Sequence, residues 1–147
     1  LGDVYKRQIP YFKKEAENLS GEIWKTHSGT KLQVSNFGRV KKDGAILSQK
    51  DTGKNKGYLY LKDWKKLGID FSGIHFKKIN WTYQLVAETW LEKDPEQEKL
   101  DETGHWEVHH ITNDGYDNRP ENLIWVKKKL HDKIHGFKNK EFNDNGD

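Results

Sequence analysis

The residues best suited to chemistry are four histidines in the last third of the chain. His109 and His110 are adjacent, and His131 and His135 are four positions apart. Residues four apart on a helix lie one turn apart on the same face, so His131 and His135 can chelate one metal ion. One further imidazole from a facing strand would complete a three-histidine site with an open coordination position. An imidazole of ordinary pKa can also accept a proton near neutral pH.

The adjacent pair is expected to serve two different roles. Neighbouring residues on a strand point to opposite faces, so His109 and His110 should not both be metal ligands. One can hold a metal ion while the other addresses a substrate. A histidine pair at helical spacing is by itself usually a feature of the surface. Four histidines within 27 residues, with a hairpin between the two pairs, favour a functional site.

Positioning these histidines requires two strands and a helix. Residues 106–111 and 123–126 are predicted strands, and the turn signal Asn113-Asp114-Gly115 lies between them. Residues from 127 onward are predicted to be helical, with one apolar face that carries Leu130, Ile134 and Phe137. The last third is therefore predicted to be a small ββα unit.

The preceding part of the chain reads as short strands followed by a helix. Aromatic-rich runs separated by Gly and Asn turns predict strands at 22–27, 32–35, 39–42, 45–49, 58–64 and 74–79. Apolar residues at helical spacing predict a helix over residues 82–91. Pro95 and the acidic run around it end this helix and predict a solvated connector.

Composition excludes several classes of protein. The chain has 147 residues and no cysteine, which excludes disulfides, thiolate zinc sites and cysteine nucleophiles. No apolar run approaches the roughly 18 residues of a membrane-spanning helix, so we expect a soluble, cytoplasmic protein with no membrane partner. Six Trp, six Tyr and six Phe indicate a folded domain with a core that depends on aromatic rings.

The charge distribution suits a polyanionic partner. The net charge is +3, and residues 92–104 contain six acidic residues against two lysines, so the rest of the chain is more basic than the total suggests. A basic body interrupted by an acidic connector is typical of proteins that bind nucleic acid, although surface lysines are also common elsewhere.

Three groups of residues resemble known motifs. Residues 108–111 (VHHI), 117–123 (DNRPENL) and 131–135 resemble the ββα-metal motif of HNH endonucleases, with Asn122 twelve residues after His110 and His131 nine after Asn122. Residues 83–90 (YQLVAETW) and 94–96 (DPE) resemble the helix and connector that precede this motif in phage and homing-type members. Residues 22–25 (EIWK) and 34–40 (VSNFGRV) resemble the NUMOD-type DNA-binding motif found at the N-terminus of those nucleases.

The resemblance implies a role for each matching residue. His110 matches the general base that deprotonates the attacking water, and Asn122 matches the asparagine whose side chain ties the loop together; a plain turn residue is the alternative for Asn122. The metal ligands would be His109, His131 and His135. The cofactor would be a divalent ion, with Zn²⁺, Ni²⁺ or Mn²⁺ favoured over Mg²⁺ by three imidazoles.

The expected partner is double-stranded DNA. Lysines and arginines near the predicted site and after the Ser-Asn-Phe-Gly turn are candidates for phosphate contacts, although each could simply belong to a solvated face. The candidates are Arg39, Lys41, Arg119, Lys127, Lys128 and Lys133.

These observations predict an α+β protein with a small strand-rich N-terminal module and a C-terminal ββα-metal nuclease unit. The expected divisions are an N-terminal extension at 1–19 that is partly artefactual, a NUMOD-like module at 20–72, a nuclease unit at 73–140 and a polar tail at 141–147. The expected function is metal-dependent hydrolysis of DNA phosphodiester bonds by a monomer in a bacterial or phage-infected cell. The alternatives are a non-catalytic DNA-binding module with a structural metal, or a metal-free interaction domain derived from a nuclease.

Overall fold

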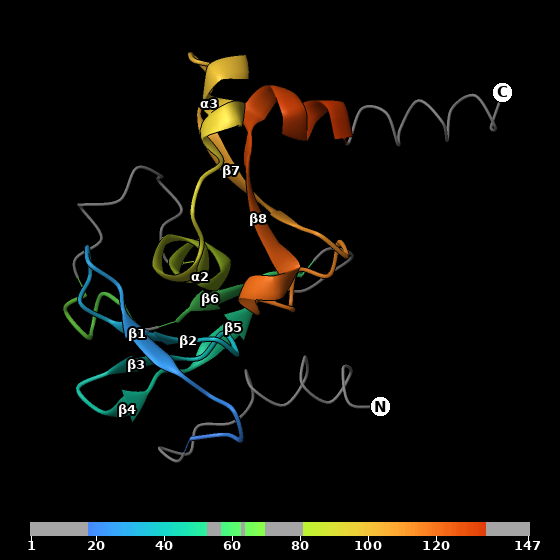
Figure 1. Cartoon of the computed structure of the whole chain (residues 1–147). Coiled ribbons are helices and arrows are strands. Elements are labelled where there is room, and N and C mark those ends of the chain that lie inside the picture. The colour runs from blue at the N-terminus through green and yellow to red at the C-terminus, as the bar shows by residue number, and fades with distance from the viewer. Residues whose placement is uncertain (1–17, 53–56, 63, 70–80, 135–147) are drawn as a thin grey trace, which may run out of the picture.

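The computed structural model describes residues 18–52, 57–62, 64–69 and 81–134 (Figure 1). The fold is α+β, as predicted, and the described residues form three small antiparallel sheets and short helices. The strand predicted at 74–79, His135 and the polar tail lie outside the described residues. Among the residues described, no helix is long and apolar enough to cross a membrane.

The first sheet is a four-stranded antiparallel meander. Its strands are β1 (Trp24–Thr26), β2 (Gln33–Ser35), β3 (Val40–Lys42) and β4 (Ala45–Ile46), in that order across the sheet. The turn between β3 and β4 has positive φ at both Asp43 and Gly44, the conformation that matches the twist of a tight hairpin.

The strand predicted at 45–49 is two strands instead. The chain leaves the first sheet after β4, and β5 (Gln49–Asp51) pairs with β6 (Leu59–Leu61) in a separate hairpin. The Gln49 side chain stabilises the chain at this change of direction, because its Nε2 donates to the carbonyl of Gly38 at 2.7 Å and its Oε1 accepts from Thr82 Oγ1 at 2.7 Å. The strand predicted at 58–64 ends at Leu61, and residues 64–68 form turns.

Helix α2 (Thr82–Trp90) joins the sheets to the C-terminal hairpin (Figure 1). It buries Leu85, Val86 and Ala87 completely. Among the described residues the core cluster around it is aliphatic, which corrects the expectation of a core that depends on aromatic rings. Trp64, Tyr83 and Trp90 pack against this cluster and are partly buried. The core side chains are Leu32, Val34, Val40, Leu61, Ile69, Leu85, Val86 and Leu123.

The predicted solvated connector contains a helix, α3 (Pro95–Leu100), none of whose residues is buried. The side chain of Asp94 accepts a hydrogen bond from the Glu96 N–H, Pro95 occupies the first turn, and Lys99 lies in the last turn. The Asp94 cap and Pro95 stabilise the N-terminus of the helix, and Lys99 stabilises its C-terminus. Acidic residues are also favourable near a helix N-terminus, so the sequence of this segment favours a helix.

The C-terminal hairpin pairs β7 (Trp106–His110) with β8 (Leu123–Lys127), and residues 128–134 are helical. A short 3-10 helix, η1 (Pro120–Asn122), precedes β8. The Gln97 side chain of α3 lies along β8, donating to the carbonyl of Trp125 at 3.3 Å and accepting from the N–H of Lys127 at 3.0 Å. Strand, loop, strand and helix therefore follow one another as the sequence predicts.

Candidate active site

His110 ends β7 and is almost enclosed, with 7% of its surface exposed. Its Nε2 lies 2.8 Å from Oδ1 of Asn118, and its ring lies 5.2 Å from the ring of Tyr83 and 5.6 Å from that of Tyr58. Burial lowers the pKa of His110, and the Asn118 hydrogen bond opposes this shift. Burial also raises the pKa of Tyr83 to about 12, so its phenol stays uncharged beside the imidazole.

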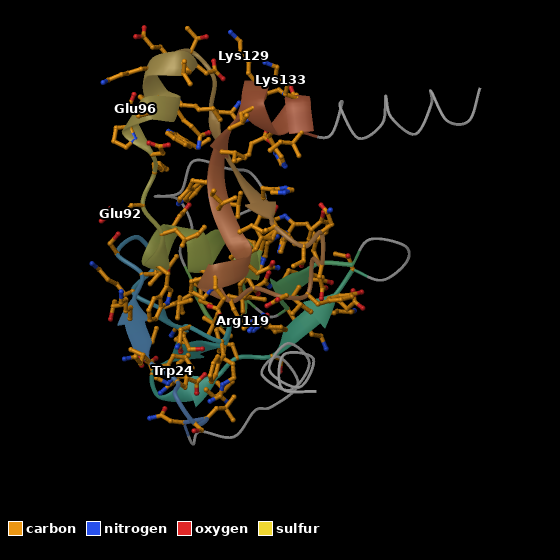
Figure 2. All side chains as sticks on the ribbon, turned by 45° about the vertical axis from the view of Figure 1, so that its right-hand side comes forward. Trp24, Glu92, Glu96, Arg119, Lys129 and Lys133 are labelled. Carbon is orange, nitrogen blue, oxygen red and sulfur yellow. The ribbon has the colours of Figure 1, made fainter. Side chains whose placement is uncertain are left out.

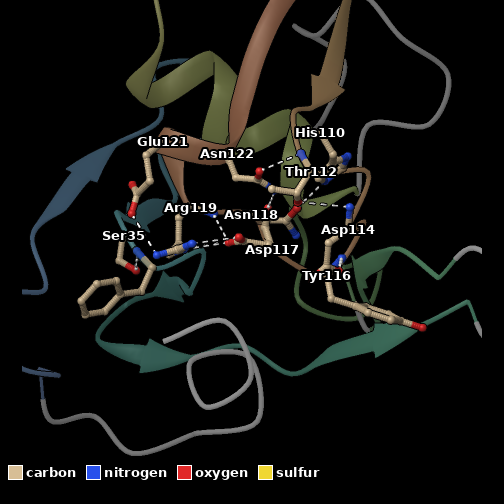
Figure 3. A network of polar contacts seen from close by, with 11 residues as sticks. Ser35, His110, Thr112, Asp114, Tyr116, Asp117, Asn118, Arg119, Glu121 and Asn122 are labelled. Carbon is tan, nitrogen blue, oxygen red and sulfur yellow. Dashed lines mark hydrogen bonds and ion pairs between the residues drawn. The ribbon is translucent and has the colours of Figure 1, made fainter. Parts of the chain in front are cut away.

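Asn122 ties the loop between β7 and β8 to itself (Figure 3). Its Oδ1 accepts from the N–H of Thr112 at 3.1 Å, and its Nδ2 donates to the carbonyl of Asp117 at 3.0 Å. Asn122 is buried and its bond to Asp117 is made away from water, where an unpaired polar group costs about 1–3 kcal/mol. The two bonds join the start of the loop, just after His110, to its end.

His109 points to the face of β7 opposite His110, as strand alternation requires. Its ring centroid lies 5.1 Å from that of His131, which is on the C-terminal helix. The Nδ1 atom of His131 lies 2.5 Å from Oε2 of Glu107, on the same face of β7 as His109. In neutral His131 this carboxylate holds the proton on Nδ1, so Nε2 carries the lone pair, an arrangement common for metal-ligating histidines.

The described residues supply two of the three predicted metal ligands. His109 and His131 face one another, and their imidazoles suit a borderline divalent ion. The third predicted ligand, His135, lies outside the described residues. Within the described ranges, no three His, Cys, Asp or Glu side chains are grouped so that they could hold a metal ion.

Two of the six candidate phosphate contacts lie inside the protein, which corrects their expected place on the surface. Arg39 is buried and its Nε donates to Oε2 of Glu22 at 2.8 Å. Lys127 is 3% exposed, and its Nζ donates to the carbonyl of Gly104 at 2.7 Å and pairs with Glu98. Both cations neutralise partners within the fold, so neither is presented to a phosphate.

The other four candidates are more accessible. Lys41 lies on β3, with its Nζ 3.9 Å from the centre of the Trp24 ring, and Arg119 forms a two-pronged ion pair with Asp117. Lys128 and Lys133 lie on the C-terminal helix, where Lys128 pairs with Asp132 and Lys133 is exposed. Figure 2 shows Lys133 at the end of the molecule that also carries Glu96 of α3, with Trp24 at the opposite end.

Sequence reasoning missed three residues of the site, namely Asn118, Glu107 and Tyr83. Strand alternation could have found Glu107, because it precedes His109 by two positions and so shares its face. Asn118 lies within the DNRPENL segment, but nothing in its spacing points to His110. The contact of Tyr83 with His110 depends on how α2 packs against the hairpin, which no local pattern encodes.

Comparison with known proteins finds a viral relative. The chain is 41% identical over 119 residues to an uncharacterized HNH endonuclease of Acanthamoeba polyphaga mimivirus. The match covers 74% of this chain and 25% of that protein, so this chain spans about a quarter of the length of its relative. No family model and no solved structure matches the chain.

Proposed function

We propose that this chain is an HNH endonuclease unit that hydrolyses DNA phosphodiester bonds with the help of a divalent metal ion. The observation that carries the proposal is the placement of His110, Asn122 and the facing pair His109 and His131 on one hairpin and its following helix. The similarity to a mimiviral protein named an HNH endonuclease supports the same activity.

His110 is the proposed general base. A lowered pKa keeps its imidazole neutral at neutral pH, so it can take a proton from water. The resulting hydroxide attacks the phosphorus, the bond from phosphorus to the 3′ oxygen breaks, and the leaving oxygen takes a proton from solvent. Asn122 contributes by holding the loop that follows His110, which keeps the base in place.

His109, His131 and His135 are the proposed metal ligands, with Glu107 orienting His131. A bound divalent ion would supply stabilisation of the negative charge that develops on the phosphorane and on the 3′ oxygen. Zn²⁺, Ni²⁺ and Mn²⁺ suit imidazole ligands better than Mg²⁺ does.

The strand-rich N-terminal part is the proposed NUMOD-like DNA-binding module. Lys41 is its candidate phosphate contact, and Arg119, Lys128 and Lys133 are the candidates beside the hairpin. Each phosphate contact would add affinity that falls as the salt concentration rises. The buried positions of Arg39 and Lys127 lead us to leave these two residues out of the proposed contact set.

Conversion of supercoiled plasmid tests the activity. The full chain is incubated with Mg²⁺, Mn²⁺, Ni²⁺ or Zn²⁺ and with EDTA, alongside His110→Ala and His27→Ala. His27 is a suitable control because it is also a buried histidine, 3% exposed, and bonds Glu88 away from the proposed site. We expect metal-dependent nicking or linearisation, about 100-fold or more slower in His110→Ala and retained in His27→Ala.

Two results would contradict the proposal. If His110→Ala and the unchanged chain cleaved DNA at equal rates, His110 would not be the general base. Intact plasmid with every metal, together with a band shift that shows binding, would favour the non-catalytic DNA-binding module with a structural metal. Because cleavage can depend on the target sequence, the assay is repeated on a pool of random DNA.

A further inference from the structure

Asn118 contacts His110 but is not among the predicted site residues. Asn118 is buried, with 3% of its surface exposed, and its Oδ1 lies 2.8 Å from Nε2 of His110. We propose that Asn118 is a positioning residue of the site, which fixes the orientation and the tautomer of His110. This inference rests on the proposed function of His110 as the general base.

The chemistry of the amide determines which ring nitrogen carries the proton. An amide oxygen can only accept a hydrogen bond, so Nε2 of His110 must donate to Oδ1 of Asn118. In the neutral ring the lone pair then lies on Nδ1, which is the atom that takes the proton from water. The hydrogen bond at Nε2 persists after this transfer, because both nitrogens of the imidazolium are donors.

The nitrogen end of the Asn118 amide, which has no hydrogen-bond partner in the described part of the chain, draws attention to the role of its oxygen. Of the side-chain polar atoms that the structure describes as buried, Nδ2 of Asn118 is left without a hydrogen-bond partner. Buried polar groups are nearly always paired, and each exception calls for a reason. Asn122, which ties the loop, uses both ends of its amide. Asn118 uses its oxygen, on His110.

The first sheet holds Asn118 in place. Gly38, in the turn between β2 and β3, packs so closely that a Cβ there would lie 3.2 Å from Cβ of Asn118 and 3.4 Å from its carbonyl oxygen. The Gly38 carbonyl is bonded to Gln49, which in turn bonds Thr82 at the start of α2. The orientation of His110 is therefore set through Asn118 by the N-terminal part of the chain.

Nitrogen NMR of the full, metal-free chain tests the tautomer without reference to activity. Long-range proton–nitrogen spectra, recorded where the imidazole is neutral, distinguish a protonated from an unprotonated ring nitrogen. We expect the proton of His110 on Nε2. Asn118→Ala should give a mixture of tautomers, and Asn118→Asp, which keeps an acceptor oxygen, should restore the proton to Nε2.

Cleavage and binding separate positioning from a general loss of structure. In single-turnover cleavage we expect Asn118→Ala to be about 10- to 100-fold slower, with the affinity for DNA unchanged and part of the rate restored in Asn118→Asp. A loss of fold would reduce affinity and rate together, and melting curves of all variants show whether this occurs.

A pair of glycine variants tests the support from the first sheet. Gly38 and Gly44 both have a φ of +82°, but a Cβ at Gly44 would meet nothing within 4 Å. Gly38→Ala and Gly44→Ala therefore impose the same backbone strain. We expect only Gly38→Ala to shift the ring-nitrogen signals of His110 and to slow cleavage.

Two outcomes would overturn the inference. A proton on Nδ1 of His110 in the unchanged chain would show that the amide has the opposite orientation. An unchanged tautomer in Asn118→Ala would show that Asn118 does not control it. Failure of the proposed nuclease activity gives a different result. If the chain cuts no DNA with any metal but Asn118→Ala still changes the His110 tautomer, then Asn118 positions His110 and the proposed reaction is wrong.

Discussion

At the scale of single residues, sequence motifs predict which site histidines approach each other, but they do not predict the ion-pair partners of the charged side chains. The resemblance to the ββα-metal motif predicts that His109 and His131 approach each other, and their ring centroids lie 5.1 Å apart. Composition could not predict the burial of Arg39 and Lys127, because it counts cations without their partners. Glu22 and Glu98 are distant in sequence from the cations they neutralise, so only the fold shows these ion pairs.

Removal of the Glu107 carboxylate should weaken metal binding. Glu107→Gln takes away the charge that holds the proton on Nδ1 of His131, so the affinity for Zn²⁺ or Ni²⁺ should fall about 10- to 100-fold. Isothermal titration calorimetry measures the change, with Glu102→Gln, an exposed carboxylate before β7, as the control. Equal affinities of Glu107→Gln and the unchanged chain would exclude a role for Glu107 in orienting His131.

Asn122→Ala should lower stability and activity together. The change leaves the Thr112 N–H and the Asp117 carbonyl without their partner, and the buried Asp117 carbonyl alone should cost about 1–3 kcal/mol. Urea unfolding measures the loss. Asn36→Ala is the matched control, since Asn36 also bonds two backbone groups but is more exposed. If Asn36→Ala lost as much cleavage activity as Asn122→Ala, the loss could not be attributed to the loop that Asn122 holds after His110.

At the scale of elements, local patterns predict most strands and the central helix. The predicted helix at 82–91 corresponds to α2, and the two predicted strands of the hairpin correspond to β7 and β8. The break between β4 and β5 was not predictable, because it depends on Gln49 bonding the distant Gly38 and Thr82. The signal for α3 was present in Asp94-Pro95, but the density of charge obscured it.

The stability of the folded chain around the first sheet should depend on pH through the Glu22 carboxyl. Burial raises the pKa of this carboxyl, but the hydrogen bonds from Arg39, the Leu19 N–H and Ser35, together with the charge of Arg39, outweigh burial, so the pKa is lowered overall. The unfolded chain therefore takes up this proton first as the pH falls. The stabilisation is complete above the unfolded value of about 4.5 and is lost as the pH falls through the lower folded value.

Carbon NMR of the Glu22 carboxyl measures this directly. Its titration midpoint should lie below about 4.5 in the unchanged chain. Glu22→Gln leaves Arg39 buried without a counter-charge and should cost about 3–5 kcal/mol of stability at neutral pH. A midpoint at or above the ordinary value would mean that the ion pair does not hold the carboxylate in its charged form.

At the scale of the whole molecule, the two predicted units share one core. Val34 and Val40 of the first sheet, with Leu32 just before β2, belong to the same cluster as Leu85 of α2 and Leu123 of β8. No window of sequence could reveal this, because the hydrophobic pattern of each element shows only that one face is buried. The division into a module at 20–72 and a unit at 73–140 stays a prediction about sequence motifs.

A shared core predicts a single unfolding transition. Leu85→Ala removes a fully buried side chain and should cost about 2–5 kcal/mol. Because α2 packs against both parts, tryptophan fluorescence and circular dichroism should report the same lowered midpoint in urea. Two separate transitions, with only one moved by the substitution, would show that the parts fold independently.

The Gln97 side chain affects how the protein behaves at high concentration. A two-stranded hairpin leaves open edges of unpaired N–H and carbonyl groups, to which another chain can add a strand. On β8, one amide side chain occupies a donor and an acceptor of such an edge, in the place where a neighbouring strand would bond. The helix that carries it is acidic, so it also repels similar copies. Gln97→Ala would uncover this edge and, in light scattering, favour assemblies of the chain with itself.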